Sequence, residues 1–274
     1  MVRFAEVNNI AVTGTLIRYT PKPKGPPDSV EMSVDGYETN IIILLSKLRW
    51  SWTGWALLKD IWRTSKTMLI IPWNELPYID NKGAYQGFNA TAGSVVVPKL
   101  SDDGKAPVNM DEVRNGNYSK KQDTLVRYNP DMWNADALAE VKFIAKVADF
   151  KQAPGVQKDE ILLHEMVHGL RQMRGTTDFH KPADTPRMDT VEEFMAIVVS
   201  NMYRSEQKRP GLRKDHWGFD ALPAAQEDPQ VFLNQPATGG ESNLSRMKQF
   251  KQQNPDFFSD LKRCPAPFNP FKLL

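Results

Sequence analysis

The pentapeptide His164-Glu165-Met166-Val167-His168 constrains the fold of this chain most strongly, because it matches the pattern H-E-x-x-H. On a helix, two histidines four residues apart project from one face and can bind one Zn²⁺ between them. Glu165 then lies about 100° further round the helix, directed at the water that completes the coordination of the metal. The pattern therefore requires a helix here and predicts a metal site on one of its faces.

The residues on either side of the pentapeptide support a helix over residues 158–173. Asp159 and Glu160 would occupy its first turn, where the helix dipole favours acids. Basic residues precede Gly175, which is a natural C-terminal stop. Most sides of the helix are apolar, which predicts that it is buried; the apolar residues are Ile161, Leu162, Met166, Val167, Leu170 and Met173.

An ordinary buried helix that carries two core histidines is the alternative to a metal site. In such a helix a buried Glu165 would be costly without a partner, and a metal site supplies one. We therefore predict that His164 and His168 bind Zn²⁺ and that Glu165 is the general base that activates the zinc-bound water.

A catalytic zinc needs a third protein ligand, and the identity of that ligand separates the classes of zinc hydrolase. The metzincin extension H-E-x-x-H-x-x-G-x-x-H is absent, because arginines stand where its glycine and third histidine would be. Glu193 is the favoured ligand, since it lies on a second predicted helix. It is far enough after His168 in the sequence for the chain to turn and for this helix to run back along the first. Glu192, Asp178 and His180 are the other candidates.

A helix cap is the structural alternative for Glu193. Residues Thr190 to Glu193 match a capping box, in which the Glu193 carboxylate would hydrogen bond to the start of the helix. Asp189 and Glu192 form an equivalent pair one residue earlier. Two acids are present where a cap needs only one, so one of them stays available for a metal.

Stabilising the oxyanion that develops on an attacked carbonyl usually needs a further hydrogen-bond donor. His216 is the first candidate, followed by Tyr203 and then Arg213. An exposed loop is the ordinary alternative for His216, and Tyr203 lies about 15 Å along its helix from Glu193. We predict His216 as the second catalytic residue beside Glu165.

Composition fits a soluble enzyme with one sizeable core, since 41% of the 274 residues are hydrophobic and 25% are charged. A net charge of +2 without a basic block argues against nucleic acid as a partner. No apolar run is long enough to span a membrane, and residues 1–14 lack the apolar core of a signal peptide. The single cysteine, Cys264, excludes an internal disulfide and is expected to be a buried or idle thiol.

The expected order of elements, with strands first and helices last, is the α+β plan of a zincin, in which the motif helix packs on a second helix. Residues 20–28 form a Pro-rich linker. This linker defines an N-terminal extension, residues 1–39, and a domain from residue 40 to 274. Helices are expected at 40–64, 129–148, 158–173 and 189–203, and strands at 67–71, 91–100 and 123–128. The side chains expected in the core include Trp50, Trp52, Trp55 and Trp62.

Three segments, residues 162–175, 191–206 and 212–219, resemble a bacterial effector-type zinc metallopeptidase. They are similar to the toxin domains at the C-terminal ends of type VI secretion spike proteins of the VgrG kind. The resemblance covers about residues 40–274 and is strongest between 158 and 219. It implies a zinc metallopeptidase domain with His164, His168 and a later glutamate as ligands, and Glu165 as base.

The resemblance also implies a toxin that is delivered into a neighbouring bacterium or a host cell and cleaves proteins or peptides there. The producing cell would hold a cognate immunity protein, and the Pro-rich linker would join the toxin to a delivery module or secretion spike. Secretion without a signal peptide fits contact-dependent delivery. A housekeeping zinc peptidase, a peptidoglycan amide hydrolase and a zincin-like binding module that no longer cleaves remain the alternatives.

Overall fold

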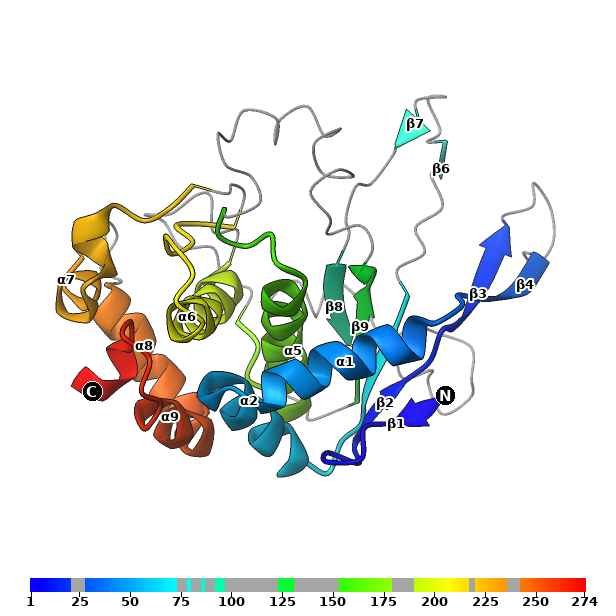
Figure 1. Ribbon diagram of the computed structural model, residues 1–274, viewed down its shortest axis with the longest axis horizontal. Helices are drawn as coiled ribbons and strands as arrows, with labels where there is room; N and C mark the ends of the chain where they lie inside the picture. The colour runs from blue at the N-terminus through cyan, green and yellow to red at the C-terminus, as the bar shows by residue number, and fades with distance from the viewer. Residues whose placement is uncertain are drawn as a thin grey trace.

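Helix α5 (Lys158–Arg174) lies between a mixed β-sheet on one side and a group of helices on the other (Figure 1). The computed structural model describes residues 1–20, 28–72, 78–79, 85–86, 92–96, 123–130, 153–178, 190–216, 220–235 and 242–274. The combination of sheet and helices makes this a mixed α+β protein, as the sequence predicts. The expected helix at 129–148 lies almost entirely outside the described residues.

The main sheet has five strands, in the order β1 (Val2–Arg3), β2 (Ile10–Val12), β5 (Met68–Ile71), β9 (Thr124–Tyr128) and β8 (Ala92–Val96). The three central strands run parallel, and β1 and β8 pair antiparallel at the two edges. Buried and half-buried residues alternate along β9, which is the period expected of a strand that packs one face on a helix. The strands predicted around 67–71, 91–100 and 123–128 are thereby confirmed.

The N-terminal residues belong in part to this sheet. Strand β2 is hydrogen bonded between β1 and β5, so residues 1–12 pack with the body of the protein. Strands β3 (Thr15–Thr20) and β4 (Asp28–Ser33) then form an antiparallel hairpin, and β6 (Tyr78–Ile79) and β7 (Tyr85–Gln86) form a second. Most of the Pro-rich linker lies outside the described residues, and the boundary at residue 40 remains a prediction.

Gly169 brings α5 close to the sheet. A Cβ atom at this position would lie 2.7 Å from Met68 Cε and 3.2 Å from Thr124 Cγ2. The glycine therefore allows a close approach of α5 to side chains of β5 and β9. It seats the histidine-bearing turns of α5 directly against the sheet.

The single helix expected at 40–64 is instead two helices, α1 (Tyr37–Arg49) and α2 (Trp52–Trp62). Ser51 separates them, because its backbone is extended and its hydroxyl accepts a hydrogen bond from the Gly54 backbone N–H at 2.9 Å. Gly54 makes the sharp junction possible, since a Cβ there would lie 2.3 Å from the Leu48 carbonyl oxygen. The apolar pattern on both sides of the break conceals it in the sequence.

The prediction that four tryptophans belong to the core is wrong. The exposed fractions are 82% for Trp50, 61% for Trp52, 40% for Trp55 and 59% for Trp62. The core face of α2 is formed by smaller residues, namely Thr53, Ala56, Leu57, Leu58 and Ile61. Because α2 is apolar on both faces, the sequence could not show which face would be buried.

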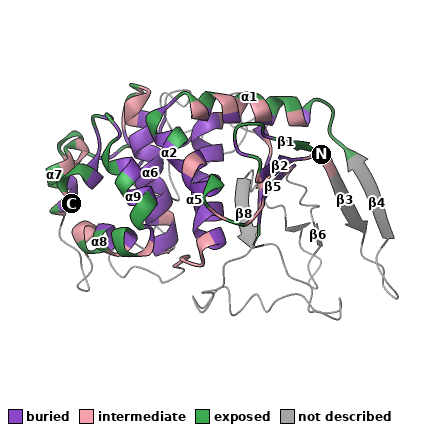
Figure 2. Ribbon diagram, turned by 90° about the horizontal axis from the view of Figure 1, so that it is seen from below, coloured by how far each residue is buried: buried purple, intermediate pink, exposed green. Residues whose placement is uncertain are grey.

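Helix α6 (Val191–Glu206) returns antiparallel to α5, and the two helices carry much of the buried surface (Figure 2). The C-terminal end of α6 reaches the acids at the start of α5. Arg204 binds Glu160 at 2.8 Å, Arg209 binds Asp159 at 2.6 Å, and the Tyr203 hydroxyl donates to Asp159 at 2.7 Å. These buried contacts set the register of the two helices.

The C-terminal residues form short helices: α7 (Pro229–Leu233), α8 (Asn243–Gln253), α9 (Pro255–Lys262) and two 3-10 turns, Ala224–Glu227 and Pro270–Leu273. Their aromatic side chains pack together; the rings in contact include Phe250, Phe257, Phe258 and Phe271. Cys264 is buried among these elements, as expected. Within the described residues, no helix has the length and apolar character that crossing a membrane requires.

Replacing Gly175 with alanine should lower the free energy of unfolding by about 1 kcal/mol, the cost of a left-handed conformation for a residue with a Cβ. Gly175 has a φ of 68° and ends α5, where the Thr176 backbone N–H donates to the Arg171 carbonyl at 2.9 Å. Urea denaturation would measure the change. Gly175→Asn is the control, because asparagine tolerates this conformation; equal stability of the wild type and the alanine variant would contradict the prediction.

Candidate metal centre

Two histidines of α5 and one glutamate of α6 converge at the contact between the helices. The Nε2 atoms of His164 and His168 lie 3.0 Å apart, and Glu193 Oε2 lies 3.1 Å from the first and 3.4 Å from the second. Both imidazoles are buried and Glu193 is half-buried. Within the part of the chain that the structure describes, these three residues are the group that could hold a metal ion.

The three donor atoms have the spacing of zinc ligands. Zn–N and Zn–O bonds are about 2.0–2.1 Å long, so two ligand atoms of a tetrahedral site lie about 3.3–3.4 Å apart. The observed separations of 3.0, 3.1 and 3.4 Å are close to this value. Two imidazoles and a carboxylate are also donors that Zn²⁺ prefers. The three side chains therefore fit a metal ion held by three protein ligands, and their donor set is compatible with Zn²⁺.

The charges of the three groups are strongly coupled. Burial lowers the pKa of His164 to about 3. Burial acts in the same direction on His168, but the Glu193 and Glu192 carboxylates raise its pKa well above its ordinary value. Burial opposes ionisation of Glu193, yet His168 and His164 hold its pKa well below its ordinary value. The cluster thus places an ionised carboxylate beside two imidazoles, which suits a cation between them.

Glu165 follows His164 on α5 and is half-buried. Burial raises the pKa of its carboxyl to about 7, and the Glu193 carboxylate adds to the effect, against His168 and Arg213. A pKa near neutrality is the range in which a carboxylate can accept a proton from one group and return it to another. This electrostatic coupling to His168 and Glu193 places Glu165 near the cluster, and its role as the base remains a prediction.

Glu192 lies behind His168 rather than in the cluster. Its Oε1 atom is 3.3 Å from His168 Nδ1, and Arg171 Nε donates to both carboxylate oxygens at 2.9 and 2.8 Å. All three side chains are buried. A carboxylate on the far nitrogen of a histidine fixes the orientation of the ring, which is a common arrangement around bound metals. In contrast, His164 Nδ1 has no hydrogen-bond partner among the described residues.

The sequence does not identify this role of Glu192 or its pairing with Arg171. One signal was present, since Arg171 stands three residues after His168 on a helix that is apolar on most sides. An arginine buried in such a helix needs an acidic partner. Glu192 and Glu193 are adjacent in sequence, so their side chains point in different directions from α6. The two carboxylates therefore have different partners.

The other candidates for the third ligand are placed elsewhere or lie outside the described residues. Asp178 Oδ2 accepts a hydrogen bond from Gln249 of α8 at 2.8 Å, and its backbone N–H donates to Glu192 at 2.9 Å. His180 lies outside the described residues. The Thr190 hydroxyl caps α6 by accepting from the Glu193 backbone N–H at 3.3 Å, while the Glu193 carboxylate faces the histidines.

His216 reaches the cluster from the loop after α6. Its Nε2 atom lies 3.6 Å from Glu193 Oε2, and its ring is parallel to that of His164, with centroids 6.2 Å apart. Tyr203 does not approach the cluster, because its hydroxyl binds Asp159 at the opposite end of α5. Of the three expected donors, His216 and Arg213 are therefore brought near the histidines and Glu193, and Tyr203 is not.

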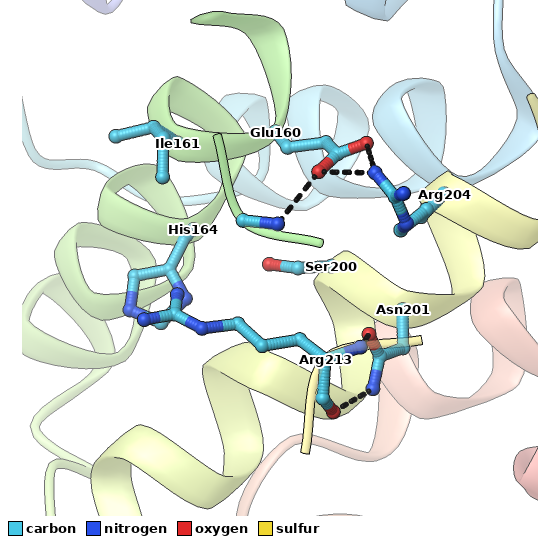
Figure 3. A pocket seen from close by; sticks show the side chains of 8 residues that line it. Glu160, Ile161, His164, Ser200, Asn201, Arg204 and Arg213 are labelled. Atoms are coloured by element: carbon cyan, nitrogen blue, oxygen red, sulfur yellow. Dashed lines mark hydrogen bonds and ion pairs between the residues drawn. The ribbon is translucent and has the colours of Figure 1, made fainter. Parts of the chain in front are cut away.

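Arg213 holds the loop that carries His216. Its guanidinium donates to the backbone carbonyls of Asp215 at 2.8 Å and His216 at 2.6 Å, while Asn201 exchanges two hydrogen bonds with the Arg213 backbone. Figure 3 shows the Arg213 side chain extending from Asn201 toward His164 beside a small cavity. The Glu160–Arg204 ion pair closes another side of this cavity. Arg213 is therefore already committed to positioning this loop.

The chain matches a known protein family over most of its length. Residues 35–247 match the model of the family Peptidase_M91, described as "Effector protein". The matched range includes α5, α6 and the loop with His216. No curated protein and no solved structure matches the chain.

Proposed function

Because the chain belongs to the Peptidase_M91 family of effector proteins, we propose that it is a zinc-dependent metallopeptidase that hydrolyses peptide bonds in a target cell. The observation that carries the proposal is the spacing of the donor atoms of His164, His168 and Glu193. On this proposal the α5–α6 pair is the zincin-like core, in which one helix supplies two histidines and the next supplies a glutamate. The sheet supports α5 from behind.

The family implies peptidase activity, and the residues present can carry out peptide hydrolysis. A bound zinc would supply a Lewis acid that makes water more acidic and polarises the scissile carbonyl. Glu165 takes the proton from the attacking water as the new C–O bond forms. The carbonyl oxygen becomes negative, and His216 donates a hydrogen bond to it. Glu165 then returns the proton to the amide nitrogen as the C–N bond breaks.

The effector assignment implies secretion and action on proteins of another cell. We propose that the domain of residues 40–274 is the peptidase and that the Pro-rich segment of the preceding residues 1–39, whose strands β1 and β2 belong to the sheet, connects to a delivery module such as a type VI secretion spike. A cognate immunity protein would protect a producer that kills its neighbours. These partners follow from the resemblance of residues 158–219 to toxin domains and are part of the proposal.

Expression of the wild type and of Glu165→Ala in the cytoplasm and in the periplasm of a bacterium tests the function. The wild type should be toxic, or should generate new protein N-termini in one compartment, and the variant should do neither. Mass spectrometry of protein termini would identify the substrates. If neither protein generated new protein termini in either compartment, and the wild type released peptides from peptidoglycan, the result would favour an amide hydrolase of the cell wall.

Replacing Glu192 with glutamine should weaken zinc binding about 10- to 100-fold, the usual effect of removing the acid that orients a histidine ligand. The amide keeps the shape but loses the charge that pairs with Arg171 and faces His168. Competition with a fluorescent zinc chelator would measure the affinity, and thermal melts would show whether the variant folds. Asp256→Asn, at an exposed acid of α9, is the matched control. Unchanged affinity in Glu192→Gln would contradict the orienting role.

A further inference from the structure

Four exposed tryptophans lie on α2 and at the turn before it. They are Trp50, Trp52, Trp55 and Trp62, four of the seven tryptophans of the chain. Positions 52, 55 and 62 fall within about 80° on a helix of 3.6 residues per turn, so these rings form one stripe. We call these four side chains the tryptophan face.

The exposure of this face is unusual for a folded protein. Scattered exposed apolar residues are normal, but a contiguous set of large apolar side chains marks an interaction surface. The opposite side of α2 already contributes Leu57, Leu58 and Ile61 to the core, and packing among the residues that the structure describes leaves the tryptophan face exposed. Within that part of the chain, the helix therefore has a second apolar face that is open to a partner.

Positive charge surrounds the Trp62 end of the face. Lys59, Arg63 and Arg263 all contact the one carboxylate of Asp260; the first two lie 3.1 and 2.6 Å away. Asp60 is shared in the same way by Arg63 and Arg174. Four cations thus face two carboxylates, which leaves the group with a surplus of positive charge.

The surplus charge is directed outward. The side chains of Asp60 and Asp260 are 0% and 7% exposed, whereas those of Lys59, Arg63 and Arg263 are 36%, 29% and 68% exposed. Lys59 also lies within the stripe of rings, between Trp55 and Trp62. An anion that approaches the tryptophan face therefore meets cations whose acidic partners are buried beneath them.

We propose that the tryptophan face docks on an anionic phospholipid bilayer. Indole rings favour the boundary between lipid headgroups and acyl chains, because one edge is polar and the rest is apolar. Lysine and arginine beside such rings reach the headgroup phosphates, and an anionic surface attracts them further. Rings and cations lie side by side on α2, so the rings can contact the acyl boundary while the cations contact the headgroup phosphates.

The docking surface is separate from the metal cluster. Helix α2 packs against α5 and α6, and Glu206, at the C-terminal end of α6, accepts from the Thr53 backbone N–H at 2.9 Å. Glu193 lies near the other end of α6, about 20 Å away along the helix axis. Docking would therefore hold the enzyme at a membrane and leave the cluster unobstructed, and the inference does not depend on the proposed peptidase activity.

Vesicle co-sedimentation of the full chain tests the inference. We expect binding to vesicles of phosphatidylcholine with a third phosphatidylglycerol, and little binding to phosphatidylcholine alone. Trp52→Gln combined with Trp62→Gln should weaken partitioning at least about tenfold, because two rings no longer insert. Arg263→Gln and raised ionic strength should each weaken it several-fold through the loss of electrostatic attraction.

The matched control replaces Val231 and Leu273, two apolar side chains outside the tryptophan face that are 41% and 49% exposed, with glutamine. This variant should bind vesicles like the wild type, and thermal melts should show that both double variants are folded. Binding that survives loss of the two tryptophans would overturn the inference. Failure of the wild type to bind any vesicle would also overturn it, and would leave a soluble protein as the partner of this face.

Discussion

Replacing Glu165 with glutamine should lower kcat for peptide hydrolysis about a thousandfold, within the range measured for loss of a general base. The amide has the size of the carboxylate but cannot accept the proton of the attacking water. Glu165 lies outside the His164–His168–Glu193 cluster, so the variant should still bind about one zinc per chain. The rate of hydrolysis would be measured on a peptide substrate that the wild type cleaves. Elemental analysis of the purified variant would measure its zinc content.

The control for this experiment is Glu227→Gln, which alters an acid that contacts the Leu212 backbone N–H on the loop preceding His216. That variant should keep most of its activity, because no part of the reaction uses its charge. Full activity of Glu165→Gln would remove the proposed mechanism. Loss of zinc from Glu165→Gln would instead make Glu165 a ligand and would require a new assignment of the base.

Replacing Glu193 or His168 with alanine should abolish stoichiometric zinc binding. Each substitution removes one of three donor atoms that lie 3.0–3.4 Å apart, and a catalytic zinc site rarely survives with two protein ligands. In the wild type, a chelator should lower the melting temperature, because bound metal stabilises the folded state. The alanine variants should show no such response, and their zinc content should be far below one per chain.

Asp178→Asn is the matched control for loss of Glu193. The Asp178 carboxylate accepts from Gln249 and lies outside the cluster, so this variant should retain zinc. If Glu193→Ala retained zinc and Asp178→Asn lost it, the assignment of the third ligand would be reversed. If both retained it, neither Glu193 nor Asp178 would be the required third ligand.

The local elements near the motif could be predicted because short-range rules determine them. The first-turn acids and Gly175 place the ends of α5, and Thr190 caps α6. The break at Ser51 was missed, because the apolar period continues across it and the close contact at Gly54 depends on the approach of two helices. The exposure of Trp50 and Trp52 was missed for a related reason, since hydrophobicity alone does not identify the face of a helix that is buried.

By itself, the sequence determined which residues can react. His164, Glu165 and His168 are related by helix geometry alone, because the spacing of residues on an α-helix is the same in any fold. The tertiary structure decided how Glu192 and Glu193 differ, and it brought His216 to the cluster. Those outcomes depend on the register between α5 and α6. Buried ion pairs between residues far apart in the sequence, such as Glu160 and Arg204, set this register. No periodicity within either helix encodes that register.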